Sequence, residues 1–118
     1  MSDHITLVSV PDAESEAQIS VYTAPALRTV LVDLMNQGRY FLVVDLTFVA
    51  LLDSTGLGVL VGCLKRLRAY DGAIVLVAPT VRMQKLLRVV GFQYLFSQFD
   101  TVDAAVEFLG RRVPQAYA

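Results

Sequence analysis

The side chains best suited to chemistry lie at the centre of the chain, where Asp53, Ser54 and Thr55 precede a glycine-rich stretch. The stretch reads Gly56-Leu57-Gly58-Val59-Leu60-Val61-Gly62 and joins the end of a predicted strand to the start of a predicted helix. One capping side chain is enough to satisfy the exposed amide groups at the start of a helix. We therefore expect Asp53 or Ser54 to cap this helix, which leaves another hydroxyl free to react.

The three glycines of this stretch need an explanation of their own. Gly56, Gly58 and Gly62 each cost a helix about 0.5–1 kcal/mol relative to alanine. The spacing of Gly58 and Gly62 by four residues predicts close approach of another backbone, either from the protein's own sheet or from a partner. A phosphate cradle is the weaker alternative, because the spacing is not that of a dinucleotide loop and the lysine of an NTP-binding loop is missing.

Other chemistry has few candidate residues. His4 is the only histidine and Cys63 the only cysteine, which excludes an internal disulfide and a Cys-based zinc site and disfavours a His-dependent triad. Asp45 and Asp53 could form a carboxylate pair at neighbouring strand ends, but an aspartate bonded to backbone donors is the simpler interpretation of Asp45. Cys63 is interpreted as a core thiol. We expect no catalysis, no metal and no cofactor.

Composition narrows the class of protein. The 118 residues suit a single domain, and a content of 55% hydrophobic and 18% charged residues excludes a disordered chain. A formal net charge of -1 argues against DNA or RNA as a partner. With neither a signal peptide nor a long apolar span, we expect a cytoplasmic protein that does not enter membranes. The basic stripe Arg82, Lys85 and Arg88 is either solubilising or suited to an acidic partner.

Strands and helices alternate along the chain and must position the central motif. Strands are predicted at 5–10, 40–46, 73–78 and 95–99, and helices at about 24–37, 54–70, 81–90 and 102–109. Thr80 and Thr101 are predicted caps, and the third helix should direct Met83, Leu86, Leu87 and Val90 to the core. This order predicts an α/β fold with a small, mixed but mainly parallel sheet of 4–5 strands and about four helices. Residues 12–18 should form a solvated loop, and 111–118 a flexible tail.

The run Asp53-Ser54-Thr55-Gly56-Leu57-Gly58 resembles the signature of the anti-sigma-factor antagonists, small bacterial proteins built on a STAS domain. The segments 21–28, 43–46, 62–66 and 86–91 follow the order and spacing of that family. The resemblance covers about residues 19–109 and implies that residues 1–118 form a single STAS domain.

The resemblance also implies a partner-switching role. In this family the unphosphorylated antagonist binds an anti-sigma factor that is also a serine kinase, and thereby frees a sigma factor. Phosphorylation of the first hydroxyl after the motif aspartate, here Ser54 rather than Thr55, abolishes binding, and a serine phosphatase reverses it. The partner-binding residues implied are Ser20, Tyr22, Thr23, Asp53, Ser54, Thr55, Gly56, Leu57, Gly58, Leu60 and Val61. A weak homodimer stays open, and a STAS module that senses a nucleotide or lipid is the alternative function.

One region departs from the family pattern. Many members have Gly-Glu-Ile-Asp before the first helix, whereas this chain has Ala17-Gln18-Ile19-Ser20. In the family that aspartate lies near the phosphorylated residue. Ser20 in its place predicts an altered contact with the kinase.

Overall fold

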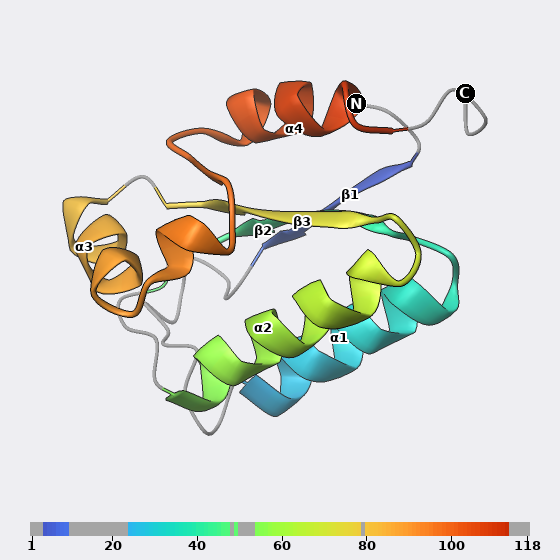
Figure 1. Ribbon diagram of the computed structural model, residues 1–118, viewed down its shortest axis with the longest axis horizontal. Coiled ribbons are helices and arrows are strands. Elements are labelled where there is room, and N and C mark those ends of the chain that lie inside the picture. The colour runs from blue at the N-terminus through green and yellow to red at the C-terminus, as the bar shows by residue number, and fades with distance from the viewer. Residues whose placement is uncertain (1–3, 10–23, 48, 50–53, 79, 114–118) are drawn as a thin grey trace.

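The computed structural model describes residues 4–9, 24–47, 49, 54–78 and 80–113. Along these residues strands and helices alternate as the sequence predicts (Figure 1). The elements are β1 (Ile5–Ser9), α1 (Ala24–Asn36), β2 (Phe41–Asp45), α2 (Ser54–Arg68), β3 (Ala73–Val77), α3 (Val81–Val89), the 3-10 helix η1 (Phe92–Tyr94), β4 (Gln98–Phe99) and α4 (Val102–Gly110). The predicted loop at 12–18 and the residues 114–118 of the predicted tail lie outside the described residues.

The four described strands form one sheet in the order β1-β2-β3-β4, and each neighbouring pair is parallel. Leu7 pairs with Val43, which pairs with Val75, so β2 and β3 occupy the centre. The α/β fold class with a mainly parallel sheet is therefore confirmed. All four carboxyl ends lie at the same edge of the sheet.

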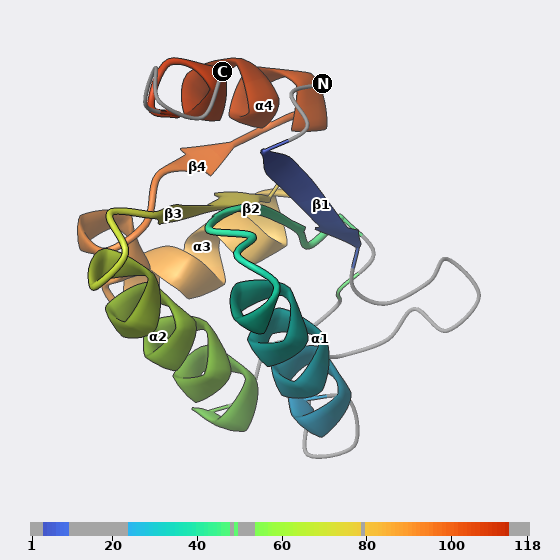
Figure 2. The ribbon, with the colours of Figure 1, turned by 90° about the vertical axis from the view of Figure 1, so that its right-hand side faces the viewer.

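Helices cover both faces of the sheet, which explains the unbroken apolar run of β2. Leu42 and Val44 pack into the core beneath α1, α2 and α3, whereas Phe41 and Val43 pack beneath α4. Figure 2 shows α1 and α2 side by side on one face and α4 on the other. Because β2 is buried on both sides, it gives the site a rigid support.

The last two helices begin at the predicted caps. The Thr80 hydroxyl accepts a hydrogen bond from the Met83 amide at 3.1 Å, and the Thr101 hydroxyl accepts one from the Ala104 amide at 3.1 Å. The prediction for Val90 is wrong, since this side chain is 41% exposed beyond the end of α3.

The predicted strand at 95–99 is shorter than expected, because η1 and the residues after it precede β4. The first two residues of the predicted tail make contacts with side chains of α4. Arg111 forms an ion pair with Glu107 at 2.9 Å, and the Arg112 guanidinium lies 4.7 Å from the centre of the Phe108 ring. These contacts hold residues 111 and 112 against α4.

A close backbone contact fixes α2 at its carboxyl end. A Cβ atom on Gly72 would lie 2.3 Å from the Tyr40 carbonyl oxygen, so only glycine fits this turn. The Tyr40 and Tyr70 rings stack beside it with their centres 4.6 Å apart. With one end anchored at the start of β2, α2 directs its N-terminus towards the carboxyl edge of the sheet.

Candidate functional site

Ser54 is the first residue of α2, as predicted, and both Ser54 and Thr55 are exposed. The first turn of α2 contains no acidic residue. The aligned peptide dipoles and free amide groups at a helix N-terminus favour a negative charge. The Ser54 hydroxyl is therefore accessible to an enzyme, in a position where an added anion is compatible with the helix. The predicted site residues Ser20, Tyr22, Thr23 and Asp53 lie outside the described residues.

The glycines of α2 leave its outer face open. Ser54, Gly58, Gly62 and Arg66 recur every four residues and so lie on one face of the helix. All four are exposed, and a Cβ atom on Gly58 or Gly62 would meet no other atom within 4 Å. The explanation that these two glycines pack against the protein's own sheet is therefore wrong. Their remaining predicted role is to admit a partner.

A groove of about 370 Å³ runs between α1 and α2 along this face. Its wall from α2 includes Thr55, Gly58, Gly62 and Arg66, so the groove starts beside the exposed hydroxyl groups. Arg66 donates a hydrogen bond to the Asn36 side chain at 2.8 Å and so connects the far ends of the two helices. Because Gly58 and Gly62 have no side chains, the groove stays open beside Thr55, the residue that follows Ser54.

The wall from α1 comes from residues that the sequence pattern does not predict as part of the site. Arg28, Val32 and Met35 line the groove. Their spacing of four and three residues on one helical face was the available signal, but it is also the spacing of an ordinary amphipathic helix. Within the described part of the chain, neither Arg28 nor Arg66 forms an ion pair with a carboxylate.

Two residues of the predicted partner surface do not belong to it. Leu60 is fully buried in the core and Gly56 is also buried, because both lie on the side of α2 that faces the sheet. The prediction that they contact a partner is therefore corrected. Leu57 and Val61 are partly buried at the sides of the helix and pack against the core.

The other candidate residues are occupied by structural roles. Cys63 is buried as predicted, and burial raises the pKa of its thiol, although the nearby Arg66 and Arg28 guanidinium groups oppose the shift. The Asp45 carboxylate accepts hydrogen bonds from the Thr47 amide at 2.9 Å and from the Thr47 hydroxyl. Asp53, the other member of the possible carboxylate pair, lies outside the described residues. No cluster of three metal-binding side chains occurs in the described ranges.

Comparison with known proteins identifies the family of this chain. The STAS domain family matches residues 9–105. An anti-sigma-B factor antagonist from Staphylococcus epidermidis is 36% identical over 78 residues, which cover 66% of this chain and 72% of that protein.

Solved structures share the fold. An anti-sigma factor antagonist from Mycobacterium paratuberculosis has a TM-score of 0.74 at 26% identity, with 93% of this chain and 89% of that chain covered. The Bacillus cell fate determinant SpoIIAA in its phosphorylated form has a TM-score of 0.68 at 16% identity, with 92% and 93% covered.

The parallel sheet, the exposed hydroxyl at the start of α2 and the family match define the class of protein: this chain belongs to the STAS domain family. Within that family it is a member of the anti-sigma factor antagonists. In the described part of the molecule, no helix is both long and apolar enough to cross a membrane.

Proposed function

We propose that this protein is a partner switch in the cytoplasm, controlled by phosphorylation of Ser54. In its unphosphorylated form it binds an anti-sigma factor that is also a serine kinase, and this binding frees a sigma factor. Phosphorylation of Ser54 abolishes the complex, and a serine phosphatase restores it. The chain itself is a kinase substrate and a binding module without catalytic activity. The observation that carries the proposal is the exposed Ser54 hydroxyl at the start of a glycine-lined, unobstructed helix face.

The location of Ser54 supports a switch that leaves the fold intact. A phosphate adds about -1.5 to -2 charges at neutral pH, and the N-terminus of α2 favours an anion. Ser54 is exposed, so the modification displaces no core side chain. The effect of phosphorylation must therefore arise at the interface and not from unfolding.

The same location explains how the phosphate releases a partner. Gly58 and Gly62 allow a partner to approach α2 closely, and this approach removes water from Ser54 at the end of that face. Burying an uncompensated charge is costly, and a loss of about 3 kcal/mol weakens binding roughly a hundredfold. A dianion on Ser54 would therefore release a partner of moderate affinity.

Phosphate mapping tests the assignment. We expect the anti-sigma factor kinase with ATP to add one phosphate to the wild-type chain, none to Ser54→Ala, and one to Thr55→Ala. Thr55 is the matched control, since it is the neighbouring exposed hydroxyl on the same helical turn. Phosphate found only on Thr55 would contradict the role of Ser54.

The groove between α1 and α2 favours one second candidate function, which is binding of an anionic nucleotide or lipid. Its walls combine the apolar side chains of Val32 and Val59 with the guanidinium groups of Arg28 and Arg66. A ligand held there stabilises the folded state, and the gain in unfolding free energy grows with the logarithm of the ligand concentration relative to its Kd. Thermal unfolding with added nucleotides or lipids, without kinase, tests this candidate, and an unchanged Tm would exclude the ligands tried.

A further inference from the structure

A second exposed surface surrounds α3, away from the glycine-lined face of α2. Of the eight exposed large apolar side chains in the described residues, five belong to α3 or to the segment that follows it. Val81, Val89 and Tyr94 are the most exposed, at 78%, 79% and 85%. We define the α3 surface as Val81, Arg82, Lys85, Arg88, Val89 and Tyr94.

The pattern on α3 is not that of a merely solubilising helix face. Val81, Lys85 and Val89 are spaced by four residues and form one exposed stripe, with Arg82 and Arg88 on either side. Valine is a poorer helix former than alanine or lysine, so exposed valines bring α3 no helical stability. Contiguous exposed apolar side chains with a polar rim are typical of interaction sites.

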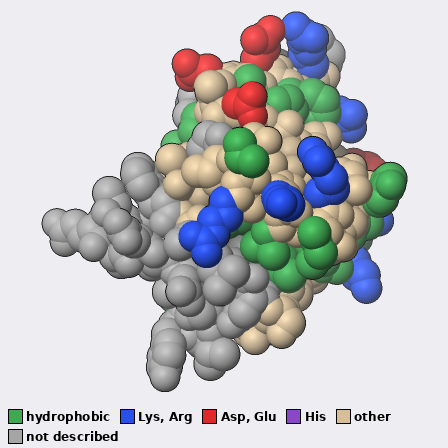
Figure 3. Space-filling model, turned by 90° about the vertical axis from the view of Figure 1, so that its left-hand side faces the viewer, with side chains coloured by type: hydrophobic (Ala, Val, Ile, Leu, Met, Phe, Trp, Pro, Cys, Tyr) green, Lys and Arg blue, Asp and Glu red, His purple; other side chains and the backbone are tan. Residues whose placement is uncertain are grey.

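The charge of this surface defines the chemistry of its partner. Arg82, Lys85 and Arg88 form no ion pair within the described part of the chain. The carboxylate of Asp100 accepts a hydrogen bond from the Gln84 side chain at 3.0 Å, on the side of α3 that faces β4. Figure 3 shows hydrophobic and basic side chains together on this face of the molecule. An acidic surface that also presents apolar side chains would complement it.

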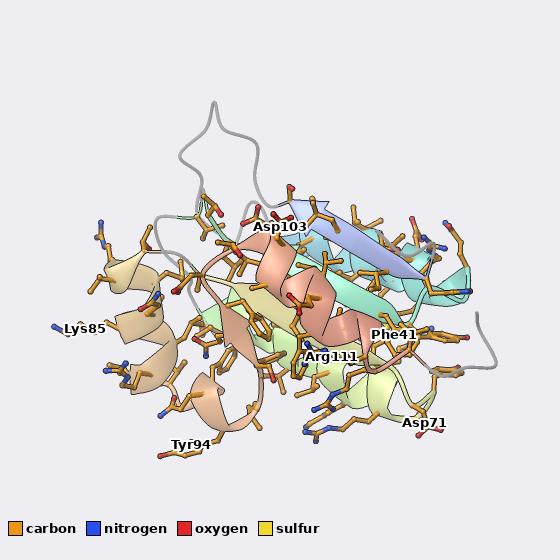
Figure 4. The ribbon with its side chains drawn as sticks, turned by 90° about the horizontal axis from the view of Figure 1, so that it is seen from above. Phe41, Asp71, Lys85, Tyr94, Asp103 and Arg111 are labelled. Atoms are coloured by element: carbon orange, nitrogen blue, oxygen red, sulfur yellow. The ribbon has the colours of Figure 1, made fainter. Side chains whose placement is uncertain are left out.

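The α3 surface lies at the same edge of the sheet as Ser54. α2 follows the carboxyl end of β2 and α3 follows that of β3, and these two strands are parallel neighbours. Lys85 and Tyr94 both point outward at this end, whereas Arg111 lies directly after α4 (Figure 4). One protein that approaches the start of α2 can therefore reach α3.

We infer that the α3 surface is a second docking site, which binds an acidic and partly apolar surface of the anti-sigma partner. The identity of that partner rests on the proposed function. A protein is favoured over an anionic membrane because interfacial helices insert a broad face rich in Trp, Phe and Leu. In α3 the larger apolar side chains Met83 and Leu87 are committed to the core.

Binding of three purified variants to the anti-sigma factor kinase tests the inference. We expect Lys85→Glu and Val89→Ser each to weaken binding about tenfold, with the loss for Lys85→Glu shrinking at high salt. Arg111→Glu is a charge reversal directly after α4, away from the α3 surface; it breaks only the exposed ion pair with Glu107 and should bind like wild type. Circular dichroism should show unchanged folding, because Lys85 and Val89 are exposed.

The outcomes separate this inference from the phosphorylation switch. Wild-type affinity of both α3 variants, with weaker binding of Ser54→Asp, would overturn the α3 surface alone. Weaker binding of the α3 variants with wild-type affinity of Ser54→Asp would support the surface and contradict the switch. A third outcome would assign the surface to a membrane and overturn the inference. In that outcome the wild-type protein binds phosphatidylglycerol vesicles, and Lys85→Glu abolishes vesicle binding but leaves binding to the kinase unchanged.

Discussion

Replacement of Gly58 and Gly62 by alanine should make the protein more stable and a poorer binder. A Cβ atom at either position meets nothing within 4 Å, so the substitution has no steric cost. Alanine improves a helix interior by about 0.5–1 kcal/mol per glycine replaced, which predicts a gain of about 1–2 kcal/mol for the double variant. For a domain of this size the Tm should rise by roughly 3–10 °C. Urea unfolding and calorimetry measure both quantities.

The matched control is Gly72→Ala, at a glycine with the opposite environment. There the Cβ atom would lie 2.3 Å from the Tyr40 carbonyl oxygen, which also accepts the Ala73 amide at 2.8 Å. We expect a loss of about 1–3 kcal/mol, as for other overpacked sites. A double Gly58→Ala/Gly62→Ala variant that is less stable than wild type would show that the α2 face is covered, which refutes the reasoning.

The functional half of this prediction uses the same double variant. Two methyl groups in the groove should keep a partner's backbone at a distance, so affinity for the anti-sigma factor should fall while stability rises. Such a trade-off between stability and binding is expected where residues that destabilise the fold are needed for function. Unchanged affinity would place the docking surface elsewhere.

Three further predictions concern residues with structural roles. Leu60→Ala should lower the unfolding free energy measured by urea titration by about 2–5 kcal/mol, because Leu60 is buried. Val61→Ala should lower it by less, because Val61 is partly exposed. Similar small losses for both variants would contradict the burial of Leu60. Thr101→Ala removes the bond to the Ala104 amide and should destabilise the protein by about 1 kcal/mol, whereas Thr101→Ser should not. Because burial raises the pKa of Cys63, its thiol should react with iodoacetamide slowly until the protein unfolds. The contribution of the protonated thiol to stability should be complete at neutral pH and be lost as the pH rises through the pKa of the folded thiol. Rapid labelling of the native protein would contradict this prediction.

Local signals in the sequence were sufficient to predict most of the fold. Thr80 and Thr101 sit directly before apolar residues at helical spacing, and the structure uses both as caps. The apolar run of β2 is explained by helices on both faces, which the alternating order of elements implied. The caps depend on neighbouring residues in the chain, and the burial of β2 follows from the order of the elements. Both can therefore be predicted without knowledge of tertiary contacts.

The orientation of individual side chains was harder to predict. Leu60 and Val61 are adjacent apolar residues in the motif, and only the packing of α2 on the sheet distinguishes the buried one from the partly exposed one. The role of Gly58 and Gly62 was undecided because the distance between α1 and α2 is a tertiary property. The same reason hid the contribution of Arg28 to the groove.

The central claim is that a phosphate on Ser54 obstructs docking without disturbing the fold. The most direct measurement compares the Kd of the unmodified chain and of the chain phosphorylated at Ser54 for the same anti-sigma factor, together with the Tm of both forms. We predict a Kd about a hundredfold higher for the phosphorylated chain, with a Tm close to that of the unmodified one. Equal Kd values, or loss of binding that accompanies unfolding, would contradict the claim.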